Sequence, residues 1–288
     1  MSALPLPAAP ASFPVPPPPA LPGGLSLPSG RTAIMGILNV TPDSVSDGGR
    51  YTDVAAALRN AREMVAAGAD LIDVGGESTR PNSTRISADE EWARICTIVE
   101  SLAADGVIVS VDTLHASTAR EAARVGAAII NDVSGGRWDP EMNAAVAQSG
   151  CAYVVQHYRA LPGMPGEHFD YGDDLVGTLI ERVGSQVQDA IDAGVTADKI
   201  VVDPGLGFSL TGDQCWQILR ELRRFLQGGY PVLVGASRKR FVKALEGDVD
   251  VNSADIAAYC AAAGAWAVRV HDVAATVAAI ARKENDVD

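Results

Sequence analysis

The feature of this sequence that most constrains its fold is a regular alternation of short apolar runs with longer segments of helical spacing. Each run is rich in aliphatic and β-branched residues, which predicts a strand, and each is followed by apolar residues that recur every three or four positions. The predicted strands are 33–38, 71–74, 107–111, 128–130, 152–156, 200–202, 232–234 and 267–270. The predicted helices are 54–67, 88–104, 116–125, 140–148, 175–193, 212–226, 238–245 with 253–263, and 273–283. This alternation is typical of a parallel α/β architecture.

A parallel α/β chain can form either a closed barrel or an open sheet, and the length of this chain favours the barrel. Residues 1–30 contain ten of the 17 prolines and no charged side chain, so we predict a disordered, solvated arm there. Subtracting these 30 residues from 288 leaves 258, close to the roughly 250 of a (β/α)8 barrel. The first predicted strand is not followed by GxGxxG, and no GxxxxGK[ST] loop occurs. We therefore predict a single (β/α)8 TIM barrel over residues 31–288, preceded by the proline-rich arm.

The net charge of the chain argues against polyanionic binding partners. The chain has 23 basic and 36 acidic side chains, a formal charge of −13 at pH 7. Binding of nucleic acid or of an anionic membrane surface needs a broad basic field, so neither partner is expected. The apolar runs are too short to span a bilayer, and no signal-peptide pattern is present, so we expect a cytoplasmic protein. An anionic small molecule would need a local cluster of cations.

Polar residues follow the predicted strands, at the barrel face where active sites lie. An Asp, Asn or Ser in such a position most often caps the next helix, and we favour that role for Asp132, Ser134 and Asp272. Lys and Arg are not explained in this way, because a helix N-terminus repels cations. The side chains expected to meet at one mouth are Asn39, Asp112, Asn131, Asp203, Lys239, Arg269 and His271.

The chemistry of these side chains points to two kinds of ligand group. Asp112, Asp203 and Asn131 suit a flat heterocycle whose edge carries N–H donors. Arg269 and His271 suit a phosphate or diphosphate. An amide oxygen near the diphosphate is compatible with Mg²⁺, which keeps several of its water ligands. No GxSxG motif is present, so acyl-enzyme chemistry is not expected.

Seven motifs stand in order along the chain: MGILNVTPDSVSDGG, DVGGESTRP, SVDT, INDVSGG, DPGLGF, GASRKRF and VRVHDV. Together they resemble dihydropteroate synthase over residues 32–282, and the run is most similar to actinobacterial members. The resemblance implies a TIM-barrel transferase, usually a homodimer and a target of sulfonamides. It implies the condensation of 6-hydroxymethyl-7,8-dihydropterin diphosphate with 4-aminobenzoate, with Mg²⁺, to give 7,8-dihydropteroate and diphosphate in folate biosynthesis.

The resemblance also implies roles for individual residues. The residues that would hold the pterin ring are Thr79, Asp112, Asn131, Asp203 and Lys239. Asn39 would bind Mg²⁺, and Arg269 and His271 would bind the diphosphate. The aminobenzoate would be bound by Ser237 and by two mobile loops that contain Asp43 and Arg80. The implied reaction is dissociative. Arg269 and His271 would stabilise the departing diphosphate, Asp112 and Lys239 would be catalytic with them, and the neutral aniline would attack the pterin cation. Such a reaction depends on electrostatic preorganisation and exclusion of water.

Departures from the family pattern keep two alternatives open. Val45 replaces a Phe of the first loop, Leu210 replaces a Lys, and Cys215 stands where an Asn is usual. These changes motivate a catalytically weak paralogue that binds pterin without turnover. The other alternative is a pterin-dependent methyltransferase with a corrinoid partner, and the diphosphate-binding Arg269 and His271 speak against it.

Overall fold

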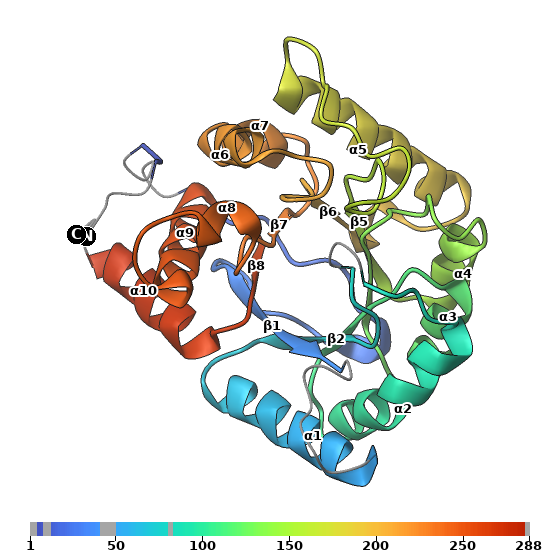
Figure 1. Ribbon diagram of the computed structural model, residues 1–288. Helices are drawn as coiled ribbons and strands as arrows, with labels where there is room; N and C mark the ends of the chain where they lie inside the picture. The colour runs from blue at the N-terminus through green and yellow to red at the C-terminus, as the bar shows by residue number, and fades with distance from the viewer. Residues whose placement is uncertain (1–4, 8–12, 41–49, 80–82, 286–288) are drawn as a thin grey trace.

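The computed structural model describes residues 5–7, 13–40, 50–79 and 83–285. In this part of the chain, eight parallel strands form a barrel surrounded by helices (Figure 1). The strands are β1 (Ala33–Asn39), β2 (Leu71–Gly75), β3 (Val109–Asp112), β4 (Ile129–Asp132), β5 (Ala152–Gln156), β6 (Ile200–Asp203), β7 (Leu233–Val234) and β8 (Ala267–Val270). Their order is β6-β5-β4-β3-β2-β1-β8-β7, and a parallel bridge between Val202 and Val232 joins the two outer strands. The predicted (β/α)8 barrel is confirmed.

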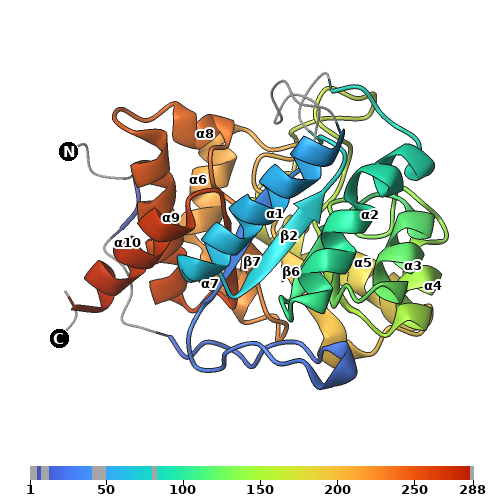
Figure 2. The same ribbon diagram turned by 90° about the horizontal axis from the view of Figure 1, so that it is seen from below.

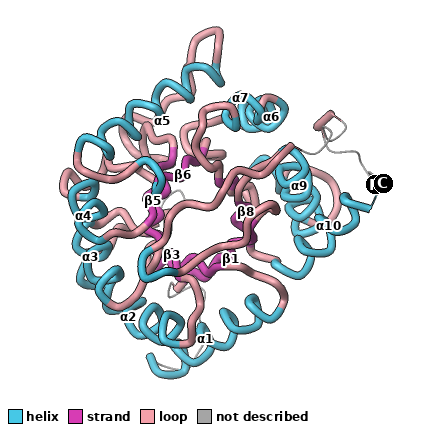
Figure 3. Tube along the Cα trace, turned by 180° about the vertical axis from the view of Figure 1, so that it is seen from behind, coloured by secondary structure: helices cyan, strands magenta, loops and turns pink. Residues whose placement is uncertain are grey.

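Helices cover the outside of this ring, as the tube seen from behind makes plain (Figure 3). They are α1 (Arg50–Ala66), α2 (Ala88–Ala104), α3 (Ala116–Arg124), α4 (Met142–Ser149), α5 (Leu175–Asp192), α6 (Gly212–Arg220), α7 (Leu222–Leu226), α8 (Arg240–Lys243), α9 (Val249–Ala263) and α10 (Val273–Asn285), with 3-10 turns at Pro22–Gly24 and Ala197–Lys199. None of them, within the described ranges, is long and apolar enough to cross a membrane.

The helix boundaries differ from the prediction by up to four residues; α1, for example, begins at Arg50 and not at residue 54. Two further differences concern α6 and α9. The segment predicted as one helix over 212–226 is divided at Glu221, which ends α6 and precedes α7. The segment predicted to begin at residue 253 begins four residues earlier. Asp248 is the reason, because its side chain accepts hydrogen bonds from the N–H groups of Asp250 and Val251 and so caps the first turn of α9.

The inside of the barrel has two layers of different polarity. Its amino-terminal half is filled by an apolar cluster that includes Met35, Leu71, Ile129 and Trp266, all fully buried. Because successive residues of a strand alternate sides, the next inward positions lie towards the carboxyl ends. Those positions carry polar side chains, among them Asn39, Asp73, Asp112, Asn131, Asp203 and Arg269. The polar layer therefore lies directly above this apolar cluster, which we call the apolar floor of the cavity.

The proline-rich segment packs against the barrel, which corrects the prediction of a solvated arm for residues 13–30. Figure 2 shows this dark blue segment running along the end of the barrel opposite the strand carboxyl termini. Leu27 is only 5% exposed and belongs to the apolar cluster inside the barrel. Ala20 donates its N–H to the carbonyl of Asp198 at 2.8 Å, and the Phe13 ring lies 4.5 Å from the guanidinium carbon of Arg223. A few apolar side chains are enough for packing because the open end of the barrel offers them an apolar surface.

Candidate active site

A cavity of about 1520 Å³ opens at the carboxyl ends of the strands. Every predicted site residue within the described part of the chain lines it. These residues are Asn39, Thr79, Asp112, Asn131, Asp203, Ser237, Lys239, Arg269 and His271. Asp43 and Arg80 lie outside the described residues, as does Val45. The structure thus brings together side chains from seven strands and the segments that follow them.

Asp112, at the end of β3, forms an ion pair with Arg269, and both side chains are partly buried. The Nη2 atom of Arg269 donates to Asp112 Oδ2 at 2.8 Å. Burial raises the pKa of the Asp112 carboxyl to about 7; the charge of Arg269 opposes the shift and the nearby carboxylate of Asp73 adds to it.

Asp203 and Lys239 carry opposite charges that lie close enough to influence each other's pKa. Asp203 Oδ1 accepts the N–H of Gly205 at 2.7 Å, and the Lys239 ammonium donates to the carbonyl of Leu206. Burial raises the pKa of Asp203 against the effect of Lys239, and burial lowers the pKa of Lys239 to about 8 against the effect of Asp203. The Lys239 stem passes so close to Gly207 that a Cβ there would lie 3.2 Å from Cδ, so a larger residue would displace the lysine.

Ser237 and His271 stand together on the β7–β8 side of the cavity. Ser237 Oγ lies 2.9 Å from His271 Nδ1 and accepts the backbone N–H of His271 at 3.2 Å, so the serine orients the imidazole ring. The neighbouring Arg238 has a left-handed φ of 56° and forms a two-point ion pair with Asp250. Asp250 neutralises the charge of Arg238, and the other cations that line this side of the cavity are Lys239, Arg240, Lys243 and Arg269.

An apolar wall borders the polar groups. Phe208 and Val133 line the cavity and pack with Leu114, Leu161 and Tyr158. The Lys239 ammonium lies 5.0 Å from the centre of the Phe208 ring. A flat aromatic ligand could therefore contact apolar groups on its face and polar groups at its edge.

Two of the departures from the family pattern are buried at the edge of the cavity. Leu210 and Cys215 both line it and are almost inaccessible to solvent. Burial raises the pKa of the Cys215 thiol to about 11, so this residue is an uncharged thiol at neutral pH. The two substitutions make this part of the wall less polar and leave the carboxylates of the mouth unchanged.

Sequence reasoning missed Asp73, in the middle of β2. Its Oδ2 atom accepts hydrogen bonds from Arg269 Nε at 2.6 Å and from Asn131 Nδ2 at 3.0 Å. The residue is fully buried and does not line the cavity. A signal was present, because Asp73 interrupts the otherwise aliphatic run 71–74 at an inward position.

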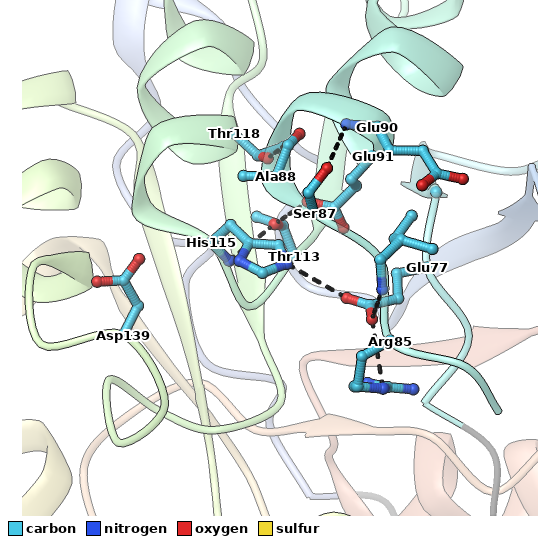
Figure 4. Close-up of polar contacts among 12 residues, drawn as sticks. Glu77, Arg85, Ser87, Ala88, Glu90, Glu91, Thr113, His115, Thr118 and Asp139 are labelled. Atoms are coloured by element: carbon cyan, nitrogen blue, oxygen red, sulfur yellow. Dashed lines mark hydrogen bonds and ion pairs between the residues drawn. The ribbon is translucent and has the colours of Figure 1, made fainter. Parts of the chain in front are cut away.

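Sequence reasoning also missed a polar cluster behind the β2–α2 connection (Figure 4). Glu77 is central to it: Oε1 lies 3.3 Å from Arg85 Nε and accepts the N–H of Ile86 at 3.1 Å, while Oε2 lies 3.4 Å from His115 Nε2. Next to it the Thr113 hydroxyl donates to Glu91 at 2.6 Å. This cluster ties the segment that follows β2 to the turn that follows Asp112.

Comparison with known proteins decides the family. A model described as "Pterin binding enzyme" matches residues 35–271, from β1 to just beyond β8. Dihydropteroate synthase of Mycobacterium leprae (strain TN) is 45% identical over 258 residues, which are 86% of this chain and 90% of that protein. The chain belongs to the dihydropteroate synthase family.

Solved structures of this family agree with the architecture. The Yersinia pestis dihydropteroate synthase, solved with a sulfonamide drug, has a TM-score of 0.84 and 37% identity over 92% of this chain and 97% of its own. The Anaplasma phagocytophilum dihydropteroate synthase, solved with 6-hydroxymethylpterin-monophosphate, has a TM-score of 0.81 and 35% identity over 88% of this chain and 99% of its own. The similarity in sequence and structure extends over nearly the whole barrel.

Proposed function

We propose that this chain is a catalytically active dihydropteroate synthase, which joins 6-hydroxymethyl-7,8-dihydropterin diphosphate to 4-aminobenzoate and releases diphosphate. The observation that carries this proposal is that one cavity is lined by two complementary kinds of group. Asp112 and Asp203 are hydrogen-bond acceptors, and Arg269 and Lys239 are cations. A pterin diphosphate needs both kinds of group, since its ring edge carries N–H donors and its other end is a polyanion.

The polar side chains that line the cavity account for pterin binding. Asp112, Asn131 and Asp203 accept hydrogen bonds from the ring edge, Lys239 contributes a buried cation, and Thr79 contacts the ring from the segment after β2. Because these groups lie in a low-dielectric site, their hydrogen bonds and charges act more strongly on the substrate than they would in water.

Loss of diphosphate leaves positive charge on the pterin and negative charge on the leaving group. Asp112 is placed to stabilise the pterin cation, and Arg269 and His271 the diphosphate. The neutral amine of 4-aminobenzoate then attacks the exposed methylene carbon, forms the C–N bond and loses a proton to solvent. Phe208 provides an apolar surface for the benzoate ring, and Ser237 a donor for its carboxylate; the contribution of Asp43 and Arg80 stays a prediction.

We also propose a Mg²⁺ ion, held by the Asn39 amide oxygen together with oxygens of the diphosphate. The donor set fits, because Asn39 lines the cavity with an amide group whose oxygen is a ligand type that Mg²⁺ accepts, and Mg²⁺ keeps several of its water ligands. The residues that the structure describes contain no group of three or more His, Cys, Asp or Glu side chains that could hold a metal, so the substrate must supply ligands. When bound, the ion would neutralise charge on the leaving group.

A homodimeric enzyme located in the cytoplasm is part of the same proposal and rests on the family resemblance. Sedimentation of the purified protein measures the oligomeric state. A mass that stays at one chain, about 29.9 kDa, over the micromolar range would contradict the dimer.

The purified protein, incubated with pterin diphosphate, 4-aminobenzoate and Mg²⁺, is expected to form dihydropteroate and diphosphate in equal amounts. Binding of pterin diphosphate without product would instead support the silent paralogue. Methyl transfer to a corrinoid protein would support the methyltransferase. Replacing Mg²⁺ with EDTA tests the ion separately, and undiminished turnover in EDTA would remove Mg²⁺ from the proposal.

A further inference from the structure

The side chain of Asp73 lies beneath the cavity, where it contacts the substrate-facing groups and not the cavity itself. It projects from the middle of β2 towards the barrel axis, and the strand register places it beside Ser110 of β3. Its Oδ1 and the Ser110 hydroxyl are buried, with no hydrogen-bond partner among the described residues. A buried carboxylate with one oxygen left over costs folding free energy, so stability alone does not explain the residue.

The other oxygen of Asp73 is shared by two donors from distant strands. Arg269 Nε comes from β8 at 2.6 Å, and Asn131 Nδ2 comes from β4 at 3.0 Å. Arg269 then uses Nη2 to reach Asp112 at 2.8 Å. The guanidinium is therefore held between two carboxylates of neighbouring strands, which limits its rotation to a single arrangement.

The contact with Asn131 has a second consequence. A carboxylate can only accept hydrogen bonds, so the amide nitrogen of Asn131 must face Asp73 and the amide oxygen must face elsewhere. Asn131 lines the cavity. With this orientation the mouth presents three acceptors, Asp112, Asn131 and Asp203, and the rotated amide would instead place a donor among them, against the N–H groups of the ligand.

We propose that Asp73 is a positioning residue for the pterin half of the substrate: it orients the Asn131 amide so that its oxygen faces the ring, and it holds Arg269 beside Asp112. The proposal rests on the proposed function, because it assumes a ligand with an N–H edge in this cavity. Asp73 acts through its two partners and does not itself touch the substrate.

Two variants test whether Asp73 acts through its hydrogen-bond acceptor or through its negative charge. D73L has nearly the same size and removes the acceptor, so the KM for pterin diphosphate is expected to rise about tenfold and kcat/KM to fall about 10²-fold, as for other misplaced catalytic groups. The KM for 4-aminobenzoate stays at the wild-type value. D73N keeps an oxygen for Arg269 and Asn131, and its new amide can donate to Ser110, so it is expected to restore most of the lost kcat/KM.

Asp70 provides a matched control at the opposite end of the same strand. It forms a two-point ion pair with Arg31 and accepts the N–H of Ile34, far from the cavity. D70L is expected to lower the melting temperature and to leave both KM values unchanged. If D73L behaves like D70L, with lower thermal stability and wild-type kinetics, Asp73 has a structural role only and the proposal is overturned.

Equilibrium binding distinguishes a failure of this proposal from a failure of the proposed function. The probe is 6-hydroxymethylpterin monophosphate, titrated by calorimetry into wild type, D73N and D73L without the second substrate. A weaker affinity of D73L, restored in D73N, supports the positioning role even if wild type forms no dihydropteroate, in which case the proposed function alone fails. Equal affinity of D73L and wild type overturns the positioning role whatever the turnover.

Discussion

Arg269 contacts both Asp73 and Asp112, so a substitution of Arg269 disturbs two ion pairs at once. Asp73 is fully buried and Asp112 is mostly so, and their charges are stabilised largely by this one guanidinium. Removing it would affect the fold as well as the reaction. At the residue scale the informative substitutions are therefore those that keep the charge or the shape and change one hydrogen bond.

R269K tests the shape of the cation. Lysine keeps the positive charge but lacks the planar fork that reaches Asp73 and Asp112 together, so we expect kcat/KM to fall about 10²-fold with a folded protein. R269A is expected to cost about 3 kcal/mol of stability in addition, because it leaves buried carboxylates unpaired. Steady-state kinetics and thermal denaturation measure the two effects. Wild-type kcat/KM in R269K would contradict the role assigned to Arg269.

The raised pKa of Asp112 predicts a pH dependence of stability. Its folded-state pKa of about 7 lies above the unfolded value near 3.8, so the folded protein binds more protons between these values. The free energy of unfolding should therefore decrease as pH rises from about 4 to 7 because of this group. D112N removes this contribution, and its stability relative to wild type should increase over the same range. Denaturant titrations at pH 5, 6 and 7.5 check this; a constant difference would contradict it.

At the scale of secondary-structure elements, Glu77 holds the connection between β2 and α2 in place. Glu77 holds Arg85 and the N–H of Ile86 on one side and His115 on the other. Burial by itself raises the pKa of Glu77, but hydrogen bonds from His115 and Ile86 outweigh it and the net shift is downward. The hydrogen bond to Glu77 raises the pKa of His115.

H115A should lose stability in a pH-dependent way. Because the folded-state pKa of His115 is raised above its unfolded value of 6.5, the stabilisation is complete below that pH and is lost as pH rises through the folded-state value. Glu77, with its lowered pKa, stays ionised above pH 4.5. We expect H115A to lower the melting temperature more at pH 6 than at pH 9. Differential scanning calorimetry at both values measures this, and equal losses would show that the ion pair contributes nothing.

At the scale of the whole molecule, residues 13–30 close the end of the barrel that lies opposite the active site. Leu27 enters the apolar cluster of the barrel interior, whereas the nearby Leu25 is 39% exposed. The segment therefore protects the apolar floor on which the polar layer rests. None of its residues lines the cavity.

Leu27 and Leu25 form a matched pair for testing this contribution. L27A should lower the free energy of unfolding by about 2 kcal/mol, because it leaves a cavity at the edge of the apolar cluster. L25A should change it by less than about 0.5 kcal/mol, as exposed positions usually do. Neither variant should alter the KM for either substrate. Urea denaturation measures the difference, and equal values for the two variants would mean that the segment is not packed in solution.

The sequence by itself determined the order of strands and helices, the barrel, and the residues that stand at the strand ends, because hydrophobic periodicity and strand termini are local properties of the chain. Only the tertiary structure decided which of these residues touch. Asp73 meets Asn131 and Arg269 across separations of 58 and 196 residues, and Leu27 covers a surface that does not exist until the barrel closes. Such contacts depend on strand register and side-chain packing in three dimensions, and neither leaves a periodic pattern in the sequence.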